Sequence, residues 1–151
     1  MEKVNIRHLD TAELEEKFDF ISIDVSFISL KLVFPVAAAV LKENGELVCL
    51  VKPQFEAGKN QVGKKGIVKD KKVHKEVILN VIEYGKLNGI YPHALSYSPV
   101  TGAKGNIEYL IFFKKISCGE KNMNETSLND MVDIQHSTID LIVDNSHEEL
   151  Q

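Results

Sequence analysis

The chain has 151 residues, a formal net charge of −4 and an apolar fraction of 44%. It is long enough for one domain with a proper hydrophobic core, and its composition is typical of a soluble globular protein. No apolar run approaches the roughly 20 residues that span a bilayer. Residues 1–10 lack the apolar core of a signal peptide, and the two cysteines do not suggest a disulfide framework. We therefore expect a cytoplasmic protein without membrane contact.

Charge is unevenly distributed along the chain. Residues 117–151 hold eight acidic residues and one lysine, whereas seven lysines fall between Lys59 and Lys75. We expect residues 117–151 to be an acidic, disordered tail with at most one short helix, because only residues 139–143 within them are apolar. The glycine- and lysine-rich residues 56–70 show no hydrophobic period. Long loops of this kind are commonly functional, and a plain solvated surface is the alternative interpretation.

The hydrophobic pattern then predicts strands and helices in alternation. Strand–helix–strand units imply a parallel sheet with right-handed crossovers, and the last two strands, joined by a short turn, should be antiparallel neighbours. No glycine-rich nucleotide-binding turn precedes the first strand. The pattern therefore predicts the carboxy-terminal half of an α/β nucleotide-binding fold, with the first strand–helix–strand unit absent. The expected elements are a strand over 18–27, a helix from near Lys31 to Asn44-Gly45, a strand over 46–55, a helix over 70–89, and strands over 92–100 and 108–117.

Three ionisable residues should meet at one edge of this sheet. Asp24 and Lys52 fall near the carboxyl ends of the first two strands, and Glu108 begins the reversed last strand. Ligands of open α/β sheets bind at this edge, and neighbouring strands lie about 4.8 Å apart. Such a cluster suits deprotonation of a weakly acidic hydroxyl, with a neutral Lys52 as general base or a charged one stabilising the alkoxide. Strand capping or a structural ion pair is the alternative interpretation.

Four ordered motifs carry a family resemblance. They are DVSFISL (24–30), LVCLVKPQFEAG (47–58), GKKGIVKD (63–70) and SPVTGAKGNIEYLIFF (98–113). Together with VNIRHL (4–9), they resemble the TlyA/haemolysin A family of S-adenosylmethionine-dependent ribosomal RNA methyltransferases over about residues 3–115. DVSF also departs from the Asn/Asp-Pro-Pro-aromatic motif of enzymes that methylate base amines, which favours a hydroxyl acceptor.

The resemblance implies a Rossmann-like, partial FtsJ-like methyltransferase domain over residues 1–116. It implies ribose 2′-O-methylation of ribosomal RNA, with Asp24, Lys52 and Glu108 in a catalytic tetrad and Lys52 as the base. S-adenosylmethionine would be held by Asp24, Val25 and Ser26. The partner would be ribosomal RNA or a ribosomal subunit. Its phosphates would be bound by Lys59, Lys64, Lys65 and Lys69.

Parts of the family pattern do not occur in this sequence. The S4-type RNA-binding domain, the glycine-rich cofactor turn and the first lysine of the tetrad are missing. We therefore expect a truncated catalytic domain that is inactive alone and binds the cofactor weakly or not at all. The alternative is a non-enzymatic RNA-binding remnant that acts through the lysine-rich loop. Self-association through an exposed sheet edge is a further expectation. Membrane lysis lacks support, because no spanning segment or basic amphipathic helix occurs.

Histidines and aromatic residues add little at this stage. His74 begins a predicted helix beside lysines, so we expect a surface or capping role. The other histidines, His8, His93, His136 and His147, show no ligand spacing, and no metal site is predicted. Phe55 and Tyr97 fall near the ligand-binding edge, where base stacking is conceivable and core packing is expected.

Overall fold

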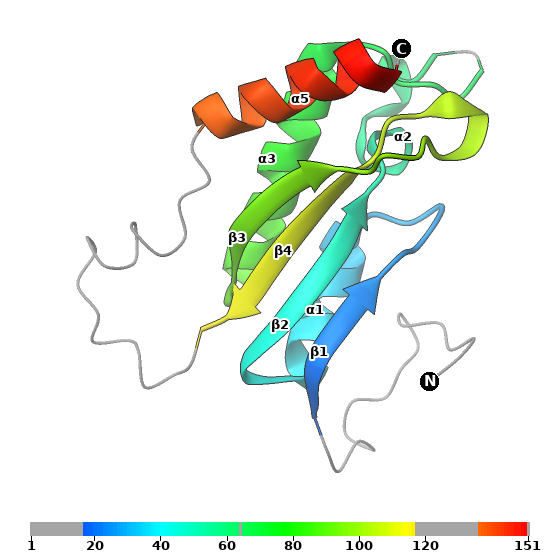
Figure 1. The fold of residues 1–151 in the computed structure, drawn as a ribbon. Coiled ribbons are helices and arrows are strands. Elements are labelled where there is room, and N and C mark those ends of the chain that lie inside the picture. The colour runs from blue at the N-terminus through cyan, green and yellow to red at the C-terminus, as the bar shows by residue number, and fades with distance from the viewer. Residues whose placement is uncertain (1–16, 64, 117–135, 151) are drawn as a thin grey trace.

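The computed structural model describes residues 17–63, 65–116 and 136–150, and the protein forms a four-stranded mixed sheet (Figure 1). The strand order is β1-β2-β4-β3, and β1 (Phe18–Ile23) runs parallel to β2 (Leu41–Val51). β4 (Tyr109–Lys115) is antiparallel to both of its neighbours, β2 and β3 (Ile90–Tyr97). The predicted α/β class, the parallel first pair and the antiparallel last strand are therefore confirmed. The prediction did not include the insertion of β4 between β2 and β3.

Two helices, α1 (Leu30–Val40) and α3 (Lys71–Leu87), cover one face of the sheet (Figure 1). Each begins at a residue whose side chain accepts a backbone hydrogen bond, Ser29 for α1 and Asp70 for α3. Their apolar positions recur at helical spacing and pack against the buried side of the strands. The core includes Val33, Phe34 and Ala37 of α1, Val77, Ile78 and Val81 of α3, and Leu47, Cys49, Val51, Ile111 and Phe113 of the sheet.

Helix α1 ends earlier than predicted. Asn44-Gly45 was expected to stop the helix, but α1 ends at Val40 and these two residues lie within β2. The β1–β2 register jumps from Phe18↔Leu41 to Phe20↔Glu46, so the extra residues form an irregularity in the strand. Asn44 has a positive φ of 62°, and a Cβ on Gly45 would lie 2.7 Å from the Lys42 carbonyl oxygen. The Asn-Gly signal therefore marks a tight bend in β2.

Residues 136–150 of the predicted tail contain one helix, as the prediction allowed, but this helix is docked on the rest of the protein. They form α5 (His136–Leu150), which packs on α3 and β3 (Figure 1). Ile139 and Val143, one helical turn apart, are buried in the core. On the flank of the helix, Asp140 and Asp144 form ion pairs with Lys75 and Lys71 of α3, at 3.2 and 3.5 Å. The remaining tail residues, 117–135 and 151, lie outside the described part of the chain.

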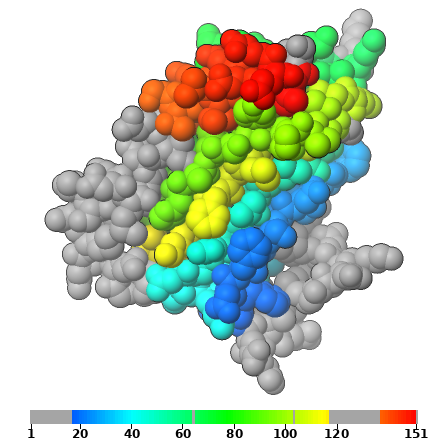
Figure 2. Space-filling model, in the orientation of Figure 1, coloured from blue at the N-terminus to red at the C-terminus, as the bar shows by residue number. Residues whose placement is uncertain are grey.

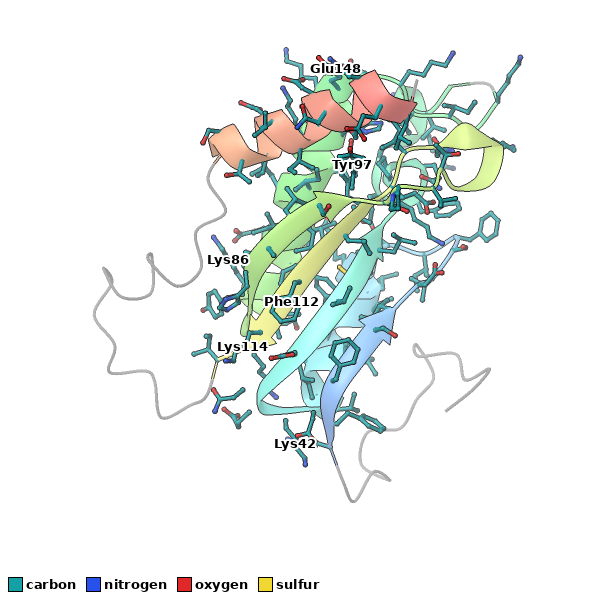
Figure 3. All side chains as sticks on the ribbon, viewed as in Figure 1. Lys42, Lys86, Tyr97, Phe112, Lys114 and Glu148 are labelled. Carbon is teal, nitrogen blue, oxygen red and sulfur yellow. The ribbon has the colours of Figure 1, made fainter. Side chains whose placement is uncertain are left out.

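The sheet face opposite α1 and α3 lies at the molecular surface over part of its area. Figure 2 views this face, where atoms of β1, β2 and β4 are visible below α5. Phe112 of β4 lies on this side of the sheet (Figure 3) and is partly buried, while Phe20 of edge strand β1 is 54% exposed. The predicted ligand-binding edge is where β1 and β2 end and β4 begins, close to α2 (Pro53–Glu56).

Candidate functional site

Asp24 and Lys52 form an ion pair at the ends of neighbouring strands. Lys52 Nζ lies 2.5 Å from Asp24 Oδ1 and donates a 3.1 Å hydrogen bond to Ser26 Oγ. The parallel register pairs Ile23 with Cys49, so Asp24 and Lys52, which follow these two residues, reach the same edge of the sheet. The Lys52 side chain is only 12% exposed, whereas that of Asp24 is 70% exposed. The first two members of the predicted cluster therefore meet as expected, with an accessible carboxylate beside a largely covered ammonium group.

Glu108 lies across from Lys52, at the start of β4. The antiparallel register pairs Val51 with Tyr109, so Lys52 and Glu108 follow as the next positions on the two strands. Glu108 is only 6% exposed, and its Oε2 accepts a 3.0 Å hydrogen bond from Gln54 Nε2. Among the described residues, the ion pair of Lys52 is with Asp24, and Glu108 contacts Gln54 instead. Glu108, the third predicted residue, thus lies at the same edge of the sheet, where Gln54 rather than Lys52 holds its carboxylate.

Helix α2 ties the loop after β1 to the loop after β2. The Glu56 carboxylate accepts hydrogen bonds from the Leu30 backbone N–H and the Ser29 hydroxyl, both at 2.7 Å. Burial raises the pKa of Glu56, and these two hydrogen bonds act in the opposite direction. Because Ser29 follows Asp24 by five residues and Glu56 follows Lys52 by four, this contact fixes the two loops that carry the ion pair.

Gly102 leaves room for the Glu108 carboxylate. A Cβ at this position would lie 2.1 Å from Glu108 Oε2, and the Gly102 N–H donates a 2.7 Å hydrogen bond to the Asn106 carbonyl. Sequence reasoning missed Gln54, Glu56 and Gly102. The available signals were the polar residues of PQFE directly after Lys52 and the glycine in the turn before Glu108.

An exposed aromatic ring stands beside Ser26. Phe27 is 89% exposed and has a positive φ of 66°, which is unusual for a residue with a bulky side chain. Its ring lies 4.8 Å from that of Phe55, centroid to centroid. Phe55 is partly buried. Tyr97 points toward α5 (Figure 3), where its hydroxyl donates to the Glu149 carboxylate. Sequence reasoning named Phe55 and Tyr97 but not Phe27, the most exposed of the three.

The lysine-rich loop leads from α2 to α3. Lys59, Lys65 and Lys69 are exposed, as an RNA-binding role requires, while Lys64 lies outside the described residues. Lys65 and Lys69 help to line an open hollow together with Gln61, Gly63, Ile67 and Asp70. The loop includes a short 3₁₀ turn over Lys59–Gln61. It therefore presents several cations on one locally ordered segment.

His74 is a buried residue, so the predicted surface or capping role is wrong. Its side chain is fully covered, and its Nδ1 and Nε2 atoms each lie 2.8 Å from a partner, the Tyr109 hydroxyl and the Val68 carbonyl. Burial is the main cause of a pKa for His74 below the usual imidazole value. It also raises the pKa of Tyr109 to about 12. These two side chains are therefore neutral hydrogen-bonding groups at physiological pH.

The motifs of this site match a known family. Residues 1–115 match the family described as FtsJ-like methyltransferase. The chain belongs to this family. It is 40% identical over 142 residues to "Putative rRNA methyltransferase YqxC" of Bacillus subtilis, covering 92% of this chain and 50% of that protein. It is 34% identical over 114 residues to "16S/23S rRNA (cytidine-2'-O)-methyltransferase TlyA" of Mycobacterium tuberculosis, covering 76% of this chain and 42% of that protein.

A solved structure has the same fold as this chain. "Putative hemolysin from Streptococcus thermophilus" superposes with a TM-score of 0.83 at 35% identity, covering 99% of this chain and 50% of that one. The chain thus spans about half the length of the relatives it matches. In the described part of the chain, no helix is both long and apolar enough to cross a membrane. The resemblance to the TlyA/haemolysin A family is therefore confirmed, together with its Rossmann-like fold.

Proposed function

We propose that this chain forms the acceptor side of an S-adenosylmethionine-dependent ribosomal RNA 2′-O-methyltransferase. The observation that carries the proposal is the Asp24–Lys52 ion pair at the ends of β1 and β2, with Glu108 opposite Lys52 in the register of β4. The names of relatives that specify cytidine 2′-O-methylation favour a ribose hydroxyl as the acceptor. The chain spans about half the length of those relatives. The methyltransferase activity of the whole protein is therefore included in what we propose.

Lys52 is the residue that acts on the acceptor hydroxyl. A ribose hydroxyl oxygen becomes a good nucleophile when its proton is removed or when its developing negative charge is stabilised. The ammonium group of Lys52 already donates to Asp24 and Ser26, and it would donate in the same way to a developing alkoxide. After losing a proton, the same amine would accept the hydroxyl proton. Asp24 orients Lys52, and Glu108, held by Gln54, supplies a second carboxylate at this edge.

Asp24, Val25 and Ser26 fit one side of a cofactor site. The Asp24 carboxylate is 70% exposed at the end of β1, where an open α/β sheet binds ligands. An accessible carboxylate suits a cationic ligand, so the residues present are compatible with S-adenosylmethionine. When bound, this cofactor supplies an electrophilic methyl group on a positively charged sulfur. The chain's own part is to place an anionic group and the polar backbone of residues 24–26 beside the acceptor.

The lysine-rich loop and Phe27 would bind the RNA. Lysines that bind phosphates release the counterions condensed on the RNA, and the affinity falls steeply with salt because added salt reduces the gain from this release. Lys59, Lys65 and Lys69 are exposed for this purpose, and Lys64 is proposed with them from its place in the sequence. The exposed ring of Phe27 lies next in sequence to Ser26, the residue that contacts Lys52. Nucleobases stack on such rings without sequence preference, which would hold an unpaired nucleotide near the site.

NMR of the isolated chain tests the proposal, because amide shifts show which residues RNA binding affects. The ¹⁵N-labelled chain is titrated with a ribosomal RNA hairpin and with the same hairpin 2′-O-methylated at its loop nucleotides. We expect the largest amide shifts at Ser26, Gln54 and Glu108 and in the loop 58–70, and smaller shifts at the first three residues with the methylated hairpin. Shifts confined to α1 or α5, with these residues unchanged, would contradict the proposed site.

A second candidate function is RNA binding without catalysis. The observation in its favour is that the chain itself carries the exposed lysines Lys59, Lys65 and Lys69. Both functions predict that Lys65→Ala weakens RNA binding and that Lys52→Ala spares it. They differ in methyl transfer, which only the enzymatic function requires and which Lys52→Ala should abolish.

We also propose that the protein acts in the cytoplasm on ribosomal RNA and associates with itself through strand β1. Within the described residues, β1 pairs on one side only, with β2, and Phe18 and Phe20 on it are 37% and 54% exposed. Unpaired edge strands promote pairing with another chain. Light scattering should show a dimer that Phe20→Lys converts to a monomer. A monomer at all concentrations would rule out this association.

A further inference from the structure

Two buried side chains hold the lysine-rich loop by its backbone. Val68 is 1% exposed, its N–H donates to Asn106 Oδ1 at 3.0 Å, and its carbonyl lies 2.8 Å from His74 Nε2. The Gly66 carbonyl accepts a 2.9 Å hydrogen bond from Asn106 Nδ2. Because an N–H needs an acceptor and a carbonyl needs a donor, these contacts leave only one orientation for the Asn106 amide. The segment between Lys65 and Lys69 is therefore attached to the body of the protein at three backbone groups.

The same segment is linked to the candidate catalytic edge. Asn106 is 2% exposed and precedes Glu108 by two residues, in the turn that leads into β4. Within the loop, the Gly63 N–H donates to the Ile67 carbonyl and the Gly66 N–H to the Gly63 carbonyl. These bonds join Gly63, Gly66 and Ile67 to one another by their backbone groups. The Asn106 side chain therefore connects these loop residues to the turn that leads into Glu108.

His74 provides the second attachment, and α5 supports it from behind. The Val68 carbonyl can only accept, so His74 Nε2 carries the proton and Nδ1 accepts from the Tyr109 hydroxyl. Tyr109 Oη lies 3.1 Å from Ser146 Oγ of α5, and the His147 ring packs 4.7 Å from the His74 ring. His74, Tyr109 and Ser146 are fully buried. The Tyr109 hydroxyl therefore fixes the orientation of the His74 ring from the side opposite Val68.

We propose that Asn106 and His74 are positioning residues that set the lysine-rich loop relative to Glu108, so that RNA phosphates bound by Lys65 and Lys69 bring an acceptor ribose to the Asp24–Lys52 pair. This inference rests on the proposed function and deepens it. Neither residue contacts RNA, because both are buried. Their effect on RNA binding is transmitted through the Gly66 and Val68 backbone.

The test compares Asn106→Ala with Asn88→Ala. Asn88 is a matched control, because its side-chain amide also donates to a backbone carbonyl, that of Tyr84, at the opposite end of α3. Hydrogen exchange of the Val68 amide and RNA affinity over a range of salt concentrations are measured for both variants. For Asn106→Ala we expect Val68 exchange to rise at least about fivefold, because the variant removes both the acceptor of the Val68 N–H and the donor to the Gly66 carbonyl. Exchange in β2 and β4 should be unchanged. RNA affinity should drop several-fold, and the salt slope should fall by about 0.7 for each phosphate that the variant no longer binds.

Lysine variants separate this inference from the proposed function. Lys65→Ala and Lys69→Ala are expected to weaken RNA binding and to reduce the salt slope. If they do so while Asn106→Ala leaves affinity and slope unchanged, the positioning role is overturned and the RNA site stands. If the lysine variants have no effect, the RNA site is wrong and the inference fails with it.

A milder variant covers a failure of Asn106→Ala to fold. Asn106→Ser leaves the position uncharged and keeps one hydroxyl group, which cannot replace both the bond from the Val68 N–H and the bond to the Gly66 carbonyl. A weaker, less salt-dependent RNA affinity for Asn106→Ser supports the positioning role. An affinity and salt slope equal to those of the wild type overturn it.

Discussion

Gly102→Ala would place a methyl group in the space that the Glu108 carboxylate occupies. The added carbon would lie 2.1 Å from Oε2, 2.4 Å from Cδ and 2.8 Å from Oε1 of Glu108. Ordinary contacts between such atoms are about 3.5 Å, so the carboxylate must move by more than 1 Å. That movement breaks its 3.0 Å hydrogen bond from Gln54. Gly102 does not have a positive φ, so the effect is steric.

The expected loss of stability combines two contributions. Overpacking of a filled site costs about 1–3 kcal/mol, and removing a hydrogen bond to a charged group costs about 1.5–3 kcal/mol. The clashing atoms are the end of a flexible side chain that can turn away, and relaxation of the loop recovers part of both contributions. We therefore expect Gly102→Ala to lower the free energy of unfolding by about 1–3 kcal/mol. This is a large share of the stability of a small domain.

Urea denaturation measures this loss, with Gly58→Ala as the control. A Cβ on Gly58 would meet only Gln61 Oε1, at 3.7 Å, and should change stability by no more than about 0.5 kcal/mol. Gly102→Ala should also cost much less in a Glu108→Ala background, where the obstructing carboxylate is gone. Equal urea midpoints for the Gly102 and Gly58 variants, or an unchanged cost in that background, would refute the reasoning.

Three further predictions concern the rest of the described chain. Because burial holds the pKa of His74 below its unfolded value of about 6.5, stability should be highest above that pH and decline below it by up to about 1.4 kcal/mol per pH unit. Urea titrations at several pH values measure this decline in stability. The control variant His93→Gln, at an exposed position, should keep most of the decline, and a stability that stays constant down to pH 5.5 would contradict the prediction. Glu56→Ala removes the acceptor of both the Leu30 N–H and the Ser29 hydroxyl and should lose about 1–2 kcal/mol in the same assay, whereas wild-type stability would show that these two bonds are dispensable. In α5, the buried Ile139→Ala should cost about 2–5 kcal/mol and the exposed Leu141→Ala almost nothing; equal costs would mean that α5 is not docked.

The part of the site that sequence could predict depends on local periodicity. Apolar runs with strand character end at Asp24 and Lys52, and parallel neighbours end at the same edge of a sheet. Glu108 followed from the short turn before the last strand, which reverses its direction. The contacts that hold these residues could not be predicted in this way. Gln54, Glu56 and Gly102 act through loops that meet only in three dimensions, so no spacing in the sequence pairs them.

His74 and α5 were misjudged for different physical reasons. His74 lies four residues before Ile78 on the buried side of α3, a signal that the flanking lysines obscured. In α5, only a short apolar run marks the buried stripe, and composition favours disorder. The helix gains its stability by docking Ile139 and Val143 into the core and by pairing acids with the lysines of α3. Such stabilisation is tertiary, and helix propensity alone does not reveal it.

The most direct test of the central claim identifies the methylated atom. Residues 1–115 replace the matching segment of the Mycobacterium tuberculosis relative, to which this chain is 34% identical, and ribosomal RNA treated with the chimera and S-adenosylmethionine is digested to nucleosides. Mass spectrometry should detect 2′-O-methylcytidine with the chimera and with Lys42→Ala, whose lysine pairs with Asp19 at the far end of β2. With Lys52→Ala it should detect none. Methyl groups on the bases, or 2′-O-methylation that survives Lys52→Ala, would contradict the account.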